Sequence, residues 1–83
     1  MALCMDSHAI DGGVRATDVA EAHLADLMVQ ERYGVRYLRY WVDELGGRIF
    51  CLVDAPDADA AVRVHREAHG LVAESIHRVV EGV

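Results

Sequence analysis

A β-hairpin signature in the middle of the chain, VRYLRYWVDELGGRIFCLVDA, constrains the fold most strongly. Residues 35–43 are rich in β-branched and aromatic side chains, Gly46-Gly47 supplies a turn, and residues 48–54 are strand-like again. A further strand pattern and a further helix pattern lie on each side of this hairpin. The hairpin therefore predicts a sheet at the centre of the fold.

The N-terminal half predicts one strand followed by one helix. Residues 2–8 are short and mostly apolar, which suits a strand. Apolar residues then recur at helical spacing up to about Arg32, with Thr17 as the expected N-cap and Gly34 as the expected C-cap.

The C-terminal half repeats this pairing in the opposite order. Asp57 is the expected N-cap of a second helix over residues 58–69, and residues 75–80 predict a last strand. The order βαββαβ is the ferredoxin-like pattern. We therefore expect one α+β domain over residues 1–83, with an antiparallel sheet that carries both helices on one face.

The face of the sheet opposite the helices predicts a homodimer. Strict alternation along residues 35–43 places Leu38, Tyr40 and Val42 on one face and sets Tyr37 and Trp41 on the other. A chain of 83 residues buries only a thin core, and large aromatic side chains on an uncovered face favour association with a second copy. We expect dimerisation through this open face of the sheet.

Charge and composition exclude several classes of function. The net charge is −6, and all eight basic residues are Arg, which argues against binding of a nucleic-acid backbone and excludes a Schiff-base lysine. The sequence has no apolar run of membrane-spanning length and no signal-peptide pattern. We expect a cytoplasmic protein with neither a nucleic acid nor a membrane as partner.

The two cysteines, Cys4 and Cys51, lie far apart in strand-like segments and form no CxxC motif. We expect buried thiols that lie lower on their strands than the histidines. On this interpretation neither cysteine is a metal ligand or part of a disulfide.

The histidines predict a metal site. His65 and His69 are four residues apart, so that their rings lie on one side of the second helix and can share one ion. The topology brings the end of the first strand (His8) to the same edge, with His23 and His77 close by. Imidazole with carboxylate and water suits nickel, zinc, copper or cobalt, and a higher coordination number favours nickel.

Other interpretations of the same residues stay open. His65 is also consistent with a hydrogen-bonded interior histidine, and His69 with a cation at a helix C-terminus. A small dimeric enzyme of the monooxygenase or isomerase type would use His65 or His8 as a general base beside Tyr40 or Tyr37. A third alternative is a dimerisation or regulatory module that needs no histidine. No complete catalytic set is legible in the sequence, and so we do not assign a reaction.

The segment GVRYLRYWVDELGGRIFCLVDAPDADAAVRVHREAHGLVAESI resembles a family of short actinobacterial proteins, formerly a domain of unknown function and now described as nickel-binding. Its most specific parts are GVRYL, FCLVDAPD and HREAHG, and the likeness extends from MDSH through ESIH. The resemblance implies a ferredoxin-like homodimer that holds nickel at its surface, in nickel response or sequestration. It implies His65 and His69 in HREAHG, and His8 in MDSH, as ligands. His23 is a candidate from its position only.

Overall fold

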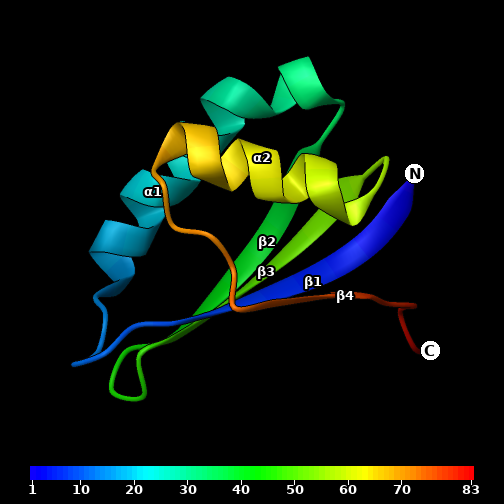
Figure 1. Cartoon of the computed structure of the whole chain (residues 1–83). Helices are drawn as coiled ribbons and strands as arrows, with labels where there is room; N and C mark the ends of the chain where they lie inside the picture. The colour runs from blue at the N-terminus through cyan, green and yellow to red at the C-terminus, as the bar shows by residue number, and fades with distance from the viewer.

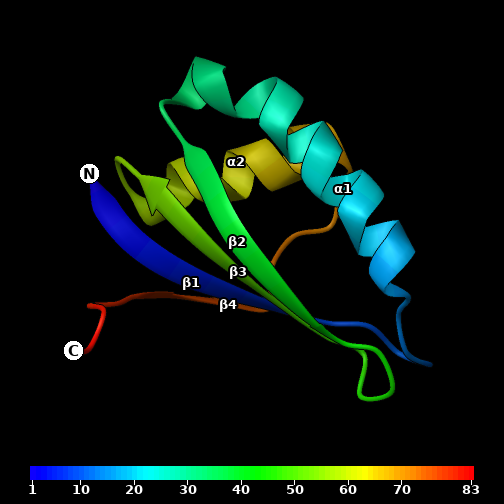
Figure 2. The same ribbon diagram turned by 180° about the vertical axis from the view of Figure 1, so that it is seen from behind.

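A computed structural model describes residues 1–83 and shows a four-stranded antiparallel sheet with both helices on one face (Figures 1 and 2). The sheet order is β2-β3-β1-β4, which confirms the ferredoxin-like fold. None of the helices is long and apolar enough to cross a membrane. Along the chain the elements are β1 (Ala2–Ala9), α1 (Ala16–Val29), the 3-10 helix η1 (Gln30–Tyr33), β2 (Arg36–Asp43), β3 (Arg48–Ala55), α2 (Ala58–Ala68) and β4 (Ser75–Arg78).

The helix ends show which local signals the chain uses. The Asp57 side chain accepts a hydrogen bond from the Ala60 N–H at 2.8 Å, as expected for the N-cap of α2. Gly34 is a left-handed C-cap at φ +66°, but it ends η1, because α1 itself already ends at Val29 with Gln30 as its C-cap. The prediction for Thr17 was wrong, because α1 already begins at Ala16 and has no side-chain cap at Arg15.

A group from another part of the chain replaces the missing cap of α1. The Glu44 carboxylate, in the turn between β2 and β3, accepts a hydrogen bond from the Ala16 N–H at 2.9 Å. A carboxylate also interacts favourably with the positive end of the helix dipole. The start of α1 is thus tied to the central hairpin.

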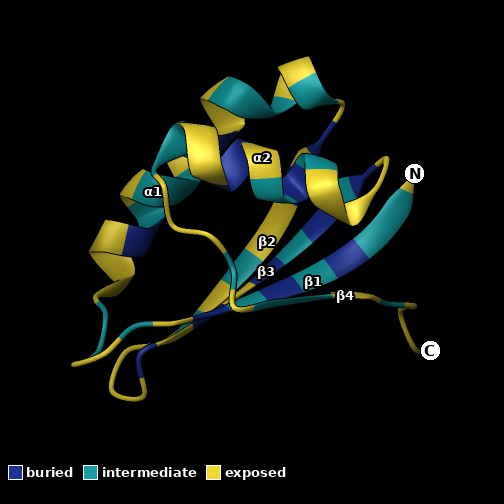
Figure 3. Ribbon diagram, in the orientation of Figure 1, coloured by how far each residue is buried: buried dark blue, intermediate teal, exposed yellow.

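The core lies between the sheet and the two helices and is thin. The buried positions of β1 and β3 alternate with more exposed ones, and they face α2 (Figure 3). Its apolar members are Cys4, Val19, Val35, Tyr37, Ile49, Cys51, Val53, Ala55, Ala61 and Val64. Four polar side chains are buried with them: Asp6, His8, Asp26 and His65.

A β-bulge in β2 changes which side chains face the helices. Tyr37 pairs with Val53, but Arg39 pairs with Leu52, so that Leu38 is an extra residue in β2. Tyr37 is therefore buried, at 4% exposure, and the prediction that it lies on the open face was wrong because strict alternation was assumed.

Candidate metal centre

His65 on α2 is the centre of the buried polar cluster. Its Nδ1 lies 2.9 Å from Oδ1 of Asp26 on α1, and its Nε2 lies 2.9 Å from Oδ2 of Asp6 on β1. An ionised carboxylate can only accept, so both ring nitrogens donate and the ring is an imidazolium. Burial alone would lower the pKa of His65, but the hydrogen bonds to Asp26 and Asp6 raise it to about 11.

The two carboxylates are held ionised by the same contacts. Burial alone would raise the pKa of Asp6, but the rings of His65 and His8 lower it to about 2. The pKa of Asp26 is lowered for a similar reason, because His65 and His69 outweigh its burial. Two buried carboxylates thus face one imidazolium, and the excess of negative charge favours a cation.

His69, at the C-terminal end of α2, completes a compact triangle with Asp26 and His65. The His69 Nδ1 accepts a hydrogen bond from the Leu71 N–H at 3.1 Å, which turns Nε2 toward the interior. This Nε2 lies 3.0 Å from Oδ1 of Asp26 and 3.1 Å from Nδ1 of His65. Adjacent ligands of an octahedral ion with bonds of about 2.1 Å lie about 3.0 Å apart. The three atoms, which we call the outer site, have this spacing.

A second group, which we call the inner site, lies on the other side of the His65 ring. Ligand atoms of Asp6, His8, Cys51 and His65 all lie within 4.8 Å of one another. The expectation that both cysteines lie lower than the histidines was wrong for Cys51, because the register places it opposite Asp6. Burial raises the pKa of the Cys51 thiol to about 11, and so the sulfur carries its proton when no metal is bound.

All four histidines that were predicted as ligands line one cavity of about 20 Å³: His8, His23, His65 and His69. Asp26 and Cys51 line it too. A cavity of this size has room for one water molecule or one ion. His23 contacts the Tyr40 ring, with the ring centroids 4.8 Å apart.

His77 does not join the other histidines. It is an exposed residue of β4 and pairs with Met5, between the buried positions Cys4 and Asp6 of β1. Strand alternation therefore directs it to the open face. The expectation that all five histidines gather together was wrong for this one.

Sequence reasoning named neither of the two carboxylates of the cluster, Asp6 and Asp26, as a candidate ligand. Asp26 is 2% exposed and follows the buried Val19 by seven residues, which places both on the inward side of α1. An acidic residue at such a position was the available signal. The Tyr37 hydroxyl donates to the Ala61 carbonyl at 2.9 Å and lies 3.4 Å from Oδ2 of Asp6. Burial raises the pKa of Tyr37, and so it stays protonated.

Comparison with known proteins agrees with this fold and identifies the family. A family model described as "Nickel responsive protein SCO4226-like" matches residues 5–79. The crystal structure of SCO4226 from Streptomyces coelicolor A3(2) is similar at 36% sequence identity and a TM-score of 0.91, covering 99% of this chain and 100% of that one. No curated protein matches. The chain therefore belongs to the family of SCO4226-like nickel responsive proteins.

Proposed function

We propose that this protein binds a divalent transition metal, nickel in the first place, and acts in nickel response or sequestration. The observation that carries the proposal is the triangle of Asp26, His65 and His69, whose ligand atoms lie 2.9, 3.0 and 3.1 Å apart. His8 and His23 line the adjoining cavity and are the further candidate ligands. The family description, which names a nickel response, supports the choice of metal.

The chemistry of the outer site suits such an ion. Two imidazoles and one carboxylate leave positions for water or for a further histidine, which fits a higher coordination number than the tetrahedral habit of zinc. In the metal-free protein the Asp26 oxygen accepts from two rings whose protonated nitrogens face each other at 3.1 Å. An ion would take the place of the two protons at this point: the Nδ1 proton of His65 would leave to solvent, and the proton of His69 would move from Nε2 to Nδ1, which gives up its hydrogen bond from the Leu71 N–H. Zinc, copper and cobalt have overlapping ligand preferences and are expected to compete.

The enzymatic alternative receives no comparable support. The cavity beside His65 has a volume of about 20 Å³, which has room for one small ion but not for an organic substrate. Tyr37, which that alternative would use as a hydrogen-bond donor to a substrate, already donates to the Ala61 carbonyl. We therefore assign no reaction.

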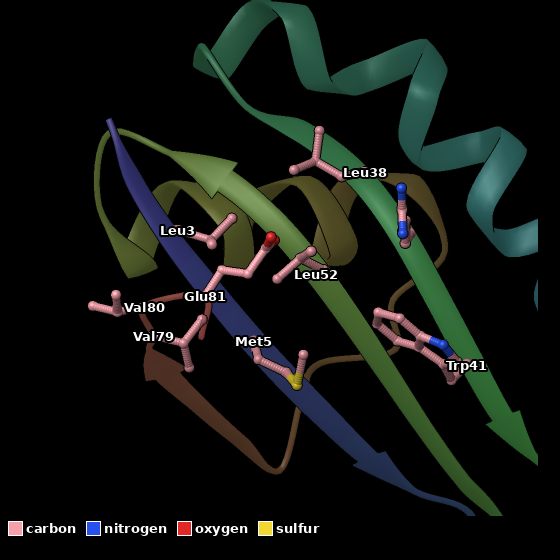
Figure 4. Close-up of a pocket in the computed structure, with 9 residues that line it drawn as sticks. Leu3, Met5, Leu38, Trp41, Leu52, Val79, Val80 and Glu81 are labelled. Carbon is pink, nitrogen blue, oxygen red and sulfur yellow. The ribbon is translucent and has the colours of Figure 1, made fainter. Parts of the chain in front are cut away.

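We further propose that a second copy of the chain covers the open face of the sheet. Side chains of β1, β2 and β3 project from this face beside the C-terminal residues, and they line a groove (Figure 4). Leu38 and Trp41 in this groove are 42% and 48% exposed. Arg39 and Glu81 also line it, and two copies related by a two-fold axis can pair these opposite charges.

Calorimetric titration of the untagged protein with nickel chloride tests the proposed metal function. We expect wild type to bind, and Asp26→Asn to weaken binding at least about tenfold, because the change removes the negative ligand. Glu67→Gln is the matched control, since Glu67 is an exposed carboxylate that pairs with Arg32 at 3.0 Å. Absence of nickel binding by wild type, or equal binding by Asp26→Asn, would overturn the proposal.

A further inference from the structure

Three elements place the four residues of the inner site. Asp6 and His8 are two residues apart on β1 and therefore point to the same side of the sheet. Cys51 is the register partner of Asp6 on β3, and His65 reaches this group from α2. All four residues are between 1% and 6% exposed. Their ligand atoms are thus brought together by the folded chain itself.

One oxygen of this cluster has no hydrogen-bond partner. Oδ1 of Asp6 is fully buried and accepts no hydrogen bond. Nε2 of His8 lies 3.3 Å from this oxygen, but the two atoms make no hydrogen bond. Buried polar atoms in folded proteins nearly always have partners, and an exception calls for a physical explanation such as a bound ion. The unpartnered oxygen therefore points to a cation.

We propose that Asp6, His8, Cys51 and His65 form a second, four-coordinate metal site, which holds a zinc-type divalent ion through the Cys51 thiolate. This inference goes beyond the proposed nickel function, because it requires a sulfur ligand and a different set of residues. The two sites share only His65, which directs Nε2 toward Asp6 and Nδ1 toward Asp26. In the inner site Asp26 is a positioning residue, because its Oδ1 accepts a hydrogen bond from the Nδ1–H of His65 and orients the ring.

The distances and the charge fit a tetrahedral site. Ligand atoms around a tetrahedral zinc ion lie about 3.3–3.8 Å apart. In the inner site, no two ligand atoms lie more than 4.8 Å apart. Metal binding then requires the longest of these distances to shorten by about 1 Å, which small side-chain movements can provide. The ion displaces one proton from Cys51 Sγ and one from His65 Nε2, and both protons leave to solvent. The two positive charges of the ion replace those of the two displaced protons, and so the net charge of the buried cluster does not change.

Cobalt is the most direct probe, because a cobalt–thiolate bond produces a sulfur-to-metal charge-transfer band in the near ultraviolet. Reduced wild type, Cys51→Ser and Cys4→Ser are titrated with cobalt chloride. Cys4 is the matched control, since it is also a free, buried cysteine of the sheet but lies outside the cluster. We expect the band in wild type and in Cys4→Ser, and its complete loss in Cys51→Ser. A wild type that binds cobalt without the band, or a band that persists in Cys51→Ser, overturns the inference.

Zinc X-ray absorption of wild type gives a second test that does not depend on the folding of a variant. We expect one sulfur at about 2.3 Å from zinc together with nitrogen and oxygen ligands. Nitrogen and oxygen ligands alone would contradict the inner site and leave the nickel proposal standing. If calorimetry shows nickel binding but neither cobalt nor zinc binds through sulfur, only the present inference fails. Absence of all metal binding overturns both.

Discussion

The ring of His65 connects three elements of the fold through its two nitrogens. It contacts Asp6 on β1 and Asp26 on α1, each at 2.9 Å, from its own position on α2. Removing one member of a buried, hydrogen-bonded ion pair costs about 3–5 kcal/mol, because the other charge is left without a partner. The same ring therefore contributes to stability in the metal-free protein and is a candidate ligand for metal. Tests of ligand roles are consequently clearer at His69, which is less deeply buried.

His69→Ala is expected to weaken nickel binding at least about ten- to hundredfold and to leave the helix content unchanged. The reason is that the change removes one corner of the outer site, while the backbone N–H of His69 still bonds the His65 carbonyl. His77→Ala is the control, because His77 is exposed and faces away from the cluster. Calorimetry measures the affinities, and circular dichroism checks the fold. Equal nickel affinity in the two variants would show that His69 is not a ligand.

The pKa shifts predict opposite pH dependences for stability and for nickel binding. The pKa of His65 is raised from 6.5 to about 11, so its contribution to stability is complete below pH 6.5 and is lost as the pH rises toward 11. The pKa of Asp6 is lowered from 3.8 to about 2, so its contribution is lost only as the pH falls from 3.8 toward 2. Metal-free protein should therefore be most stable between these two ranges, and nickel, which must displace a proton from His65, should bind more strongly at higher pH.

Urea unfolding at several pH values checks this prediction. We expect the metal-free protein to lose about 1–3 kcal/mol of unfolding free energy between about pH 6 and about pH 8.5. The stabilisation produced by added nickel should increase over the same range. Unfolding free energy that stays constant or rises over this range would show that His65 is not an imidazolium in the folded state.

At the scale of secondary structure, the sequence predicted which segments are helices and strands, because apolar periodicity and turn residues are local signals. It also predicted the pairing of His65 with His69, which depends only on helical spacing. It could not predict the extra residue Leu38 in β2, because a bulge depends on the partner strand. For the same reason the register that brings Cys51 opposite Asp6 was not foreseen.

The two helix N-termini give a matched test of this difference between local and long-range signals. Asp57→Ala should lower the free energy of unfolding by about 1 kcal/mol, since the carboxylate accepts the Ala60 N–H in the structure. Thr17→Ala should change it by less than about 0.5 kcal/mol, because Thr17 is exposed and caps nothing. Urea unfolding measures both. Equal losses in the two variants would mean that Thr17 does cap α1 in solution.

At the scale of the whole molecule, the two faces of the sheet carry different kinds of side chain. The face toward the helices is closed and contains the histidine and aspartate cluster. The open face carries an exposed cross-strand pair, Trp41 and Phe50, at 48% and 38% exposure. Exposed apolar surface of this kind typically marks a protein–protein contact. Association and metal binding are therefore expected to depend on separate residues.

Light scattering should give about twice the 9.1 kDa mass of one chain for wild type at micromolar concentration. Trp41→Glu should reduce it to the mass of the monomer, because a dimer would bury two unpaired carboxylates at the interface. Leu45→Glu is the control, since Leu45 is 98% exposed in the β2–β3 turn and does not line the groove. A monomeric wild type, or a dimer that persists in Trp41→Glu, would show that the open face does not mediate association.

Anomalous scattering at the nickel absorption edge shows directly whether the interior cluster of this protein binds nickel. Crystals of the untagged protein grown with nickel provide the measurement, because the signal locates the element independently of any assumed ligand. We predict an anomalous peak about 2.1 Å from Oδ1 of Asp26, Nδ1 of His65 and Nε2 of His69. Nickel peaks confined to the molecular surface, with none beside His65, would show that the interior cluster does not bind nickel.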